Sequence, residues 1–175
     1  DVKTFLQAAK ILQAQGQDIE FLVLGPADEE PDYDQECRDL ARSLGLGENC
    51  RFAGKVDMAE WYPLIDVAVL TSLSEAQPYV ILEANAVGVP VVATDVGACR
   101  EMLEGRDDED RALGASCLLT GVARPEETAA AVLKLLGDAK LWEGMSKAGR
   151  RRVQDRYDQK DLLSRYRNLY EQMMR

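Results

Sequence analysis

Glu75 and Glu83 are the residues of this sequence whose types and spacing most clearly suggest chemistry. Pro78 lies between them and fits the first turn of a helix, because its ring fixes φ and that position needs no N–H donor. The amides of Tyr79 and Val80 would then be among the unpaired donors at the helix N-terminus, where the helix dipole favours an anion. An anion-binding turn with a carboxylate on each side suits a phosphorylated molecule that carries hydroxyl groups.

An ordinary structural role also explains these residues. Glu75 can simply be an acidic residue that the helix dipole favours near the helix start. Glu83 stands between the apolar residues Leu82 and Ala84, where a carboxylate is expensive to bury alone. It can therefore pair with a lysine or arginine from elsewhere in the chain. The spacing by itself leaves the ligand-binding and the structural hypotheses open.

Strands and helices alternate along the sequence on both sides of this stretch. Apolar runs predict strands over residues 19–24, 50–54, 67–70, 91–94 and 116–119. The runs are apolar throughout instead of alternating with polar residues, which indicates a parallel sheet buried on both faces. We therefore expect an α/β fold, a doubly wound, Rossmann-like parallel sheet with helices on both faces.

The position of the two glutamates agrees with this fold. Ligands of doubly wound sheets bind at the carboxyl ends of the strands, where the strand order reverses. The loops after Leu24, Phe52, Leu70 and Thr94 all emerge at that edge, and the loop after Leu70 carries Glu75. The remaining elements are helices, including an amphipathic one over residues 2–15 and terminal ones over residues 138–156 and 158–174.

Length and composition indicate one globular domain. The 175 residues can bury a substantial core, and no apolar run is long enough to cross a bilayer. No signal peptide is visible, and Asp1 already enters a helical pattern without an initiator methionine, so we expect an excised piece of a longer protein. The cysteines are widely spaced and are typical of reduced thiols in a cytoplasmic protein; they are Cys37, Cys50, Cys99 and Cys117.

The charge distribution argues against nucleic acid as a partner. The net charge is -10, whereas a nucleic-acid surface needs a positive field. Residues 1–139 hold 11 basic and 26 acidic side chains, while residues 140–175 hold 10 basic and 5 acidic ones. The basic segment can contact an acidic domain or, as a peripheral association, an anionic membrane surface. A solvated helix face is the simpler explanation.

The sequence predicts no metal site. It contains no histidine, so the commonest zinc ligand and the usual general base are both missing. The acidic runs over residues 28–34 and 107–110 are interpreted as solvated, exposed loops, because no ligand spacing recurs in them.

Residues 74–84 and 88–97 together resemble the donor-binding signature of family 4 (group 1) glycosyltransferases, which are retaining enzymes of the two-domain GT-B type. The seven residues between Glu75 and Glu83 match the E-x7-E motif of that family. The resemblance spans nearly all of the chain, as the carboxyl-terminal donor-binding domain. Within the family, residues 74–78 (SEAQP) and 97–101 (GACRE) are most similar to the PelF-like enzymes of bacterial exopolysaccharide synthesis.

The resemblance implies a role for each matching position. Glu75 would contact the hydroxyls of the transferred sugar, and Glu83 those of the nucleotide ribose. Backbone amides from Gln77 to Val80 would hold the diphosphate. Lys55 and Val56 would border the base. Gly97 has two open roles, the approach of its backbone to the sugar-phosphate and a turn that enters the next helix.

The chain also departs from the family pattern. Ala76 and Gln77 stand where members usually carry glycine and an aromatic residue, and Pro78 removes one amide from the cradle. The basic residues that neutralise the diphosphate lie before residue 1 in the family pattern. An amino-terminal acceptor domain is thus expected outside this chain, and the chain alone is expected to be inactive.

The implied reaction moves a hexose from a nucleotide sugar, most simply a UDP-sugar, to a saccharide acceptor. Helix-end amides would stabilise the charge on the departing diphosphate. Glu75 is assigned to orienting the sugar and not to proton transfer, and no cofactor or metal is expected. Two alternatives stay open: a sugar-nucleotide 2-epimerase with the same architecture, or a non-catalytic nucleotide-binding or docking module that uses residues 140–175. Those terminal helices can also pair with a second copy in a dimer.

Overall fold

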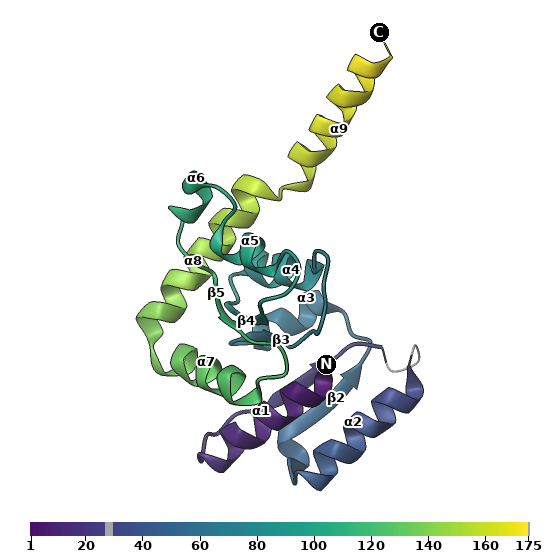
Figure 1. Cartoon of the computed structure of the whole chain (residues 1–175), viewed down its shortest axis with the longest axis vertical. Coiled ribbons are helices and arrows are strands. Elements are labelled where there is room, and N and C mark those ends of the chain that lie inside the picture. The colour runs from purple at the N-terminus through teal and green to yellow at the C-terminus, as the bar shows by residue number, and fades with distance from the viewer. Residues whose placement is uncertain (27–29, 175) are drawn as a thin grey trace.

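Five parallel strands alternate with helices in the computed structural model of this chain, which describes residues 1–26 and 30–174 (Figure 1). The strands are β1 (Phe21–Leu24), β2 (Cys50–Gly54), β3 (Ala68–Leu70), β4 (Val91–Thr94) and β5 (Cys117–Thr120). β1 pairs with β2, and β4 pairs with both β3 and β5, always in parallel. The predicted α/β fold with parallel strands is confirmed. Within the described residues, however, hydrogen bonds join the strands into two sets instead of one sheet.

The helices start at the signals that the sequence provides. Aspartates accept hydrogen bonds from first-turn amides of five of them, which satisfies donors that a helix start leaves unpaired. Prolines open two others. The helices are α1 (Val2–Ala14), α2 (Pro31–Ser43), α3 (Met58–Trp61), α4 (Tyr79–Val87), α5 (Cys99–Glu104), α6 (Asp108–Arg111), α7 (Pro125–Gly137), α8 (Ala139–Arg156) and α9 (Gln159–Met173). Short 3-10 turns, η1 (Gly47–Asn49) and η2 (Tyr62–Leu64), precede β2 and follow α3.

Strand β4 shows why the fold is doubly wound. Its residues are all buried, and they alternate between two hydrophobic clusters. Val92 belongs to a cluster with α1 and α7, whereas Val91 and Ala93 belong to a cluster with α4 and α5. Helices therefore cover both faces of the β3–β4–β5 set, as the apolar strands predict.

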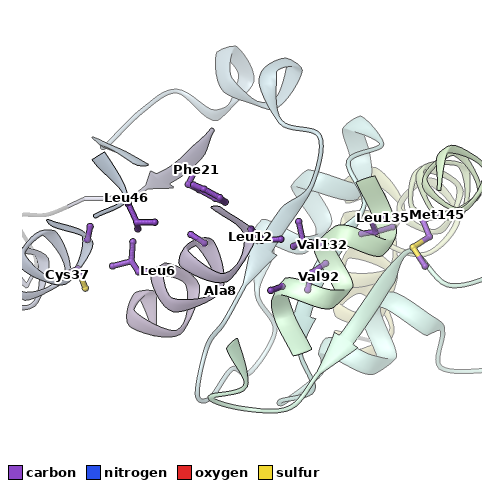
Figure 2. Packing of buried hydrophobic residues seen from close by; sticks show 13 residues of the cluster. Leu6, Ala8, Leu12, Phe21, Cys37, Leu46, Val92, Val132, Leu135 and Met145 are labelled. Atoms are coloured by element: carbon purple, nitrogen blue, oxygen red, sulfur yellow. The ribbon is translucent and has the colours of Figure 1, made fainter. Parts of the chain in front are cut away.

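The cluster of α1 and α7 also links the two sets of strands. Figure 2 shows Leu12 of α1, Val132 of α7 and Val92 of β4 lying together, with Phe21 of β1 close by. Partly buried residues of β2 and β3 pack against the same cluster. Burial of each large side chain contributes about 1.5–3 kcal/mol, so this shared cluster holds the strands in place without hydrogen bonds between the two sets.

The acidic run over residues 107–110 is exposed at its first three positions, as the sequence suggests, but it forms the start of helix α6 instead of a loop, and Asp110 is buried. Asp107 is the N-cap of α6, and its carboxylate accepts from the amide of Asp110 at 2.8 Å. Asp110 is fully buried and forms an ion pair with Arg152 of α8 at 2.6 Å, while Arg156 pairs with Asp107 and Glu109. The interpretation as solvated faces is therefore wrong for Asp110 and Arg152, which are buried, whereas Asp107, Asp108 and Glu109 are exposed. The other acidic run, over residues 28–34, lies partly outside the described residues. Its described part includes the first turn of α2, which starts at Pro31.

Arg152 lies at the centre of a buried polar cluster, here called the Arg152 cluster and made of Arg152, Asp110, Ser116 and the carbonyls of Leu103 and Gly114. The guanidinium has five N–H donors. They donate to the Asp110 carboxylate, the Ser116 hydroxyl and the carbonyls of Leu103, Asp110 and Gly114, at 2.6–3.4 Å. Every donor is used, so α8 is fixed against α6 and the segment before β5.

Helix α9 extends away from the rest of the chain (Figure 1), and all of its residues are exposed. Its apolar side chains are spaced so that they line one side of the helix, and they are between 50 and 74% exposed; they are Leu162, Leu163, Tyr166, Leu169, Tyr170 and Met173. Among the described residues, none of the helices combines the length and the apolar character that a membrane span requires.

Candidate functional site

The loop that carries Glu75 leaves the carboxyl end of β3 and is fixed by two threonines. The hydroxyl of Thr71 donates to the backbone oxygen of Asp1 at 2.7 Å, which places the start of α1 beside the loop. The hydroxyl of Thr94, at the end of β4, donates to the carbonyl of Ser72, also at 2.7 Å. Both threonines are buried, so these bonds are shielded from competing water.

Gly97 supports the same loop through a close approach of two backbones. Its φ is +53°, and a Cβ atom at this position would lie 1.9 Å from the carbonyl oxygen of Glu75. The next amide, of Ala98, donates to the carbonyl of Ala76 at 3.1 Å. Gly97 lies in the turn before α5, one of its two open roles, and it also holds the Glu75 loop. Its contact with a sugar-phosphate stays a prediction.

Glu75 is half-buried, and its carboxylate accepts a hydrogen bond from the hydroxyl of Ser72 at 2.7 Å. The buried Cys99 is close by. Burial raises the pKa of its thiol, and the negative charges of Glu75 and Asp95 raise it further, so the thiol stays protonated.

The first turn of α4 leaves backbone donors unpaired. Pro78 is buried and occupies the N-cap position, whereas the sequence suggests that it is the first residue of the helix. No side chain caps the helix. Among the described residues, the amides of Tyr79 and Val80 donate no hydrogen bond. The side chains of Tyr79 and Val80 are 72 and 40% exposed, and Gln77 is exposed as well, so this turn faces solvent. The predicted turn with unpaired amides is thus present and open, and its binding of an anion stays a prediction.

Glu83 is exposed and is held by a tyrosine instead of a cation. The hydroxyl of Tyr62, in η2, donates to Oε2 of Glu83 at 3.1 Å and lies 3.4 Å from the carbonyl oxygen of Val80. Burial raises the pKa of the Tyr62 phenol, and the Glu83 carboxylate raises it further, so the phenol remains a donor. Tyr62 is part of the hydrophobic core and also orders a site residue.

Neither Glu75 nor Glu83 forms an ion pair with a lysine or arginine of residues 1–26 and 30–174. A neighbouring acid behaves differently: Asp95, which follows β4, pairs with Arg100 at 2.5 Å. The cationic partner that would have given Glu83 a purely structural role is thus missing from the described residues. We call Glu75, Glu83 and the amides of Tyr79 and Val80 together the α4 site.

Lys55 and Val56 follow β2, at the carboxyl end of a strand in the other set. Lys55 is exposed and Val56 is half-buried. The turn is shaped by Gly54, whose φ is +69° and whose carbonyl accepts from the amide of Gly25 at 2.9 Å. In the part of the chain that the structure describes, no hydrogen bond or ion pair joins Lys55 to Glu75 or Glu83, so its role beside a base stays a prediction.

Sequence reasoning missed the supporting residues of the α4 site. Ser72 lies three residues before Glu75, and its hydroxyl was a local signal that could have been used. Thr94 and Tyr62 lie far from their partners in sequence, and only the fold brings them together. Within the described residues, no group of three or more aspartate, glutamate or cysteine side chains is arranged to hold a metal ion.

The geometry of the α4 site limits what it can do. Unpaired amides at a helix start attract an anion such as a phosphate. Carboxylates without cationic partners are acceptors for the hydroxyls of a sugar or ribose. The arrangement therefore suits a sugar phosphate or a nucleotide sugar.

Comparison with known proteins agrees with this chemistry. The family described as Glycosyl transferases group 1 matches residues 1–138 of the chain. The N-acetyl-alpha-D-glucosaminyl L-malate synthase of Bacillus anthracis is 30% identical over 140 residues, which are 78% of this chain and 34% of that protein. The chain thus spans about a third of the length of this relative.

Solved structures show the same fold. The C-terminal domain of the glycosyl transferase group 1 family protein LpcC from Francisella tularensis superposes with a TM-score of 0.73 and 25% identity, over 89% of this chain and 78% of that one. Anabaena HepE, solved in complex with UDP and glucose, gives a TM-score of 0.79 and 22% identity, over 95% of this chain and 44% of that one.

Proposed function

We propose that this chain, which belongs to the glycosyl transferases group 1 family, is the donor-binding domain of a retaining GT-B glycosyltransferase. The full enzyme would move a hexose from a UDP-sugar to a saccharide acceptor. The observation that carries the proposal is the first turn of α4, whose two unpaired amides stand in the sequence between two glutamates that have no cationic partner among the described residues. The likeness to the C-terminal domain of LpcC supports the assignment to a carboxyl-terminal domain.

In this proposal each part of the donor meets one part of the α4 site. The amides of Tyr79 and Val80, with that of Gln77, hold the diphosphate. Glu83 accepts hydrogen bonds from the ribose hydroxyls, and Glu75 from the hydroxyls of the transferred sugar. The fold that the chain shares with HepE, which binds UDP and glucose, supports UDP as the nucleotide.

The proposed reaction needs no proton transfer from this chain. As the bond to the sugar breaks, negative charge develops on the leaving diphosphate, and the amides at the start of α4 stabilise it. Glu75 holds the sugar by its hydroxyls so that the acceptor hydroxyl attacks on the face from which the diphosphate departs, and the departing phosphate oxygen takes the proton of that hydroxyl. The loop contacts of Ser72 and Gly97 keep Glu75 in position for this task.

Calorimetric titration of the chain with UDP tests the proposal. Glu83→Ala should weaken UDP binding by about 1–3 kcal/mol, the scale of hydrogen bonds to a charged group. The matched control is Glu126→Ala, which removes an exposed carboxylate from the first turn of α7. A chain that does not bind UDP, or one in which both variants bind it as the unsubstituted chain does, would contradict the assignment.

We also propose that the exposed apolar side of α9 is covered in the full protein, by the amino-terminal acceptor domain of the same molecule. A surface of six large apolar side chains, each at least half exposed, supports a contact of this kind. Sedimentation analysis measures the oligomeric state of the chain. A monomer agrees with this assignment, whereas a dimer that Leu169→Glu dissociates would assign the surface to a second copy.

The setting of the enzyme is proposed from the sequence alone. Residues 74–78 and 97–101 support a PelF-like, cytoplasmic enzyme of exopolysaccharide synthesis that uses no metal or cofactor. Assay of the full-length protein with a panel of UDP-hexoses, with and without EDTA, tests this. Binding of UDP without turnover of any donor would favour the non-catalytic module instead.

A further inference from the structure

The hydroxyl of Tyr62 stands between two functional parts of the α4 site. It has one hydrogen to donate, and the nearer acceptor is Oε2 of Glu83, at 3.1 Å against 3.4 Å for the carbonyl of Val80. A hydrogen bond to an ionised acceptor is stronger than one to a neutral carbonyl. The donor is therefore directed mainly at the carboxylate.

This hydrogen bond affects how much rotamer freedom Glu83 loses when a ligand binds. Glu83 is exposed, and a free glutamate side chain would lose much rotamer freedom when a ligand orders it. Tyr62 is itself buried among Ile81, Ala84 and other core residues, so its hydroxyl is a fixed point. Because Oε2 is bound to this fixed donor, the carboxylate is ordered in advance, and Oε1 accepts no hydrogen bond from any described residue.

The same hydroxyl lies beside the carbonyl of Val80, in the turn whose amides face solvent. Tyr62 thus contacts both the carboxylate and the backbone of the first turn of α4. Burial keeps the phenol protonated, so it can donate throughout the physiological pH range.

We propose that Tyr62 is a positioning residue that holds the Glu83 carboxylate ready for the ribose hydroxyls of a nucleoside diphosphate. The inference rests on the proposed function, because it assigns a ligand to Glu83. Tyr62 does not touch the ligand; it acts through Glu83 by ordering the acceptor before binding.

Calorimetry on Tyr62→Phe with two ligands provides the test. One ligand is UDP, and the other is UDP that lacks the ribose 2′ and 3′ hydroxyls. Phenylalanine keeps the buried ring and removes only the hydroxyl, so the variant should fold. UDP binding should weaken about three- to tenfold, and binding of the dideoxy ligand should not change. Tyr157→Phe, another tyrosine that is only partly exposed, is the matched control and should leave both affinities unchanged.

A second variant removes the acceptor of the Tyr62 hydrogen bond instead of its donor. Glu83→Asp keeps the charge but shortens the side chain by one methylene, so the carboxylate no longer reaches the Tyr62 hydroxyl. Glu83 is exposed, and its replacement leaves the core intact. Adding Tyr62→Phe to Glu83→Asp should not weaken UDP binding further, because the two residues act through one bond.

The outcomes separate this inference from the proposed function. If the unsubstituted chain does not bind UDP, the proposed function fails. If UDP binds and Glu83→Ala weakens it, but Tyr62→Phe binds UDP unchanged, only the role of Tyr62 is overturned. An equal loss for UDP and for the dideoxy ligand would also overturn it, since a general structural role does not depend on ribose hydroxyls.

Discussion

The Arg152 cluster and the α4 site both contain charged side chains and backbone polar groups, but these groups are paired in the first and unpaired in the second. In the Arg152 cluster both charges are fully buried, and all five guanidinium donors have acceptors. In the α4 site two backbone amides have no acceptor among the described residues, and both carboxylates lack a cation. The Arg152 guanidinium finds all of its acceptors in the protein itself, whereas the α4 site leaves its polar groups for something else to bind.

Burial explains why the chain tolerates both. An unpaired polar group costs much free energy in the interior, so the Arg152 cluster has to be complete. At the start of α4 the same groups face water, which satisfies them until a ligand replaces it. Burial of the charged groups therefore indicates a structural role for the Arg152 cluster, and their exposure indicates a binding role for the α4 site.

Arg152→Ala should give the largest effect on stability. It leaves Asp110 buried without its partner, and loss of one member of a buried ion pair costs about 3–5 kcal/mol. Urea denaturation measures the free energy of unfolding. The control is Arg151→Ala in the same helix, which removes an exposed pair with Asp155 and should cost less than about 1 kcal/mol.

The two sites should also differ in their effect on UDP binding. Under conditions in which Arg152→Ala is folded, its affinity for UDP should equal that of the unsubstituted chain, while Glu83→Ala should lose affinity at nearly unchanged stability. Equal stabilities for the two arginine variants would show that the Arg152 cluster does not stabilise the fold.

Gly97→Ala should affect both stability and the α4 site. The left-handed backbone and the overlap of the new Cβ with the Glu75 carbonyl should together cost about 2–4 kcal/mol. Gly16→Ala is the matched control, because Gly16 also has a positive φ but no atom within 4 Å of the added carbon, and it should cost only about 1–2 kcal/mol. Thermal unfolding and UDP titration of both variants measure the difference. If the two variants lose equal stability and bind UDP alike, Gly97 does not hold the loop.

The smallest expected effect concerns Cys117, which directly follows Ser116 of the Arg152 cluster. Burial raises the pKa of the Cys117 thiol from about 9 to about 12. The protonated thiol therefore contributes its full stability below pH 9, and this contribution is lost as pH rises from about 9 to about 12, by about 1 kcal/mol at pH 10. Cys117→Ala should unfold with a weaker pH dependence between pH 8 and 10, measured by urea denaturation. Cys50→Ala, at a half-buried thiol, should change that dependence less; an equal change would contradict the pKa assigned to Cys117.

Local patterns predicted much of the fold. The apolar run of β4 is buried on both faces, and the elements that flank it lie close to where hydrophobic periodicity placed them. The α4 turn was also predictable, because Pro78 and the neighbouring residues determine a helix start by themselves. Only its N-cap position differed by one residue.

Contacts between distant residues could not be predicted in the same way. Arg152 and Asp110 are 42 positions apart, and nothing in a run of four adjacent acids shows that the last one is buried until the path of α8 is known. Tyr62 and Glu83 are 21 positions apart, and neither position carries a signal for the other. The division of the strands into two hydrogen-bonded sets depends on backbone geometry between β1 and the other set, which hydrophobic patterns do not encode.

The most direct measurement is a crystal structure of the chain soaked with UDP. The account predicts that diphosphate oxygens lie within about 3.2 Å of the amide nitrogens of Tyr79 and Val80, with a ribose hydroxyl on the Glu83 carboxylate. A nucleotide bound at another edge of the chain, or an α4 site that stays empty at a UDP concentration that saturates binding in solution, would contradict it.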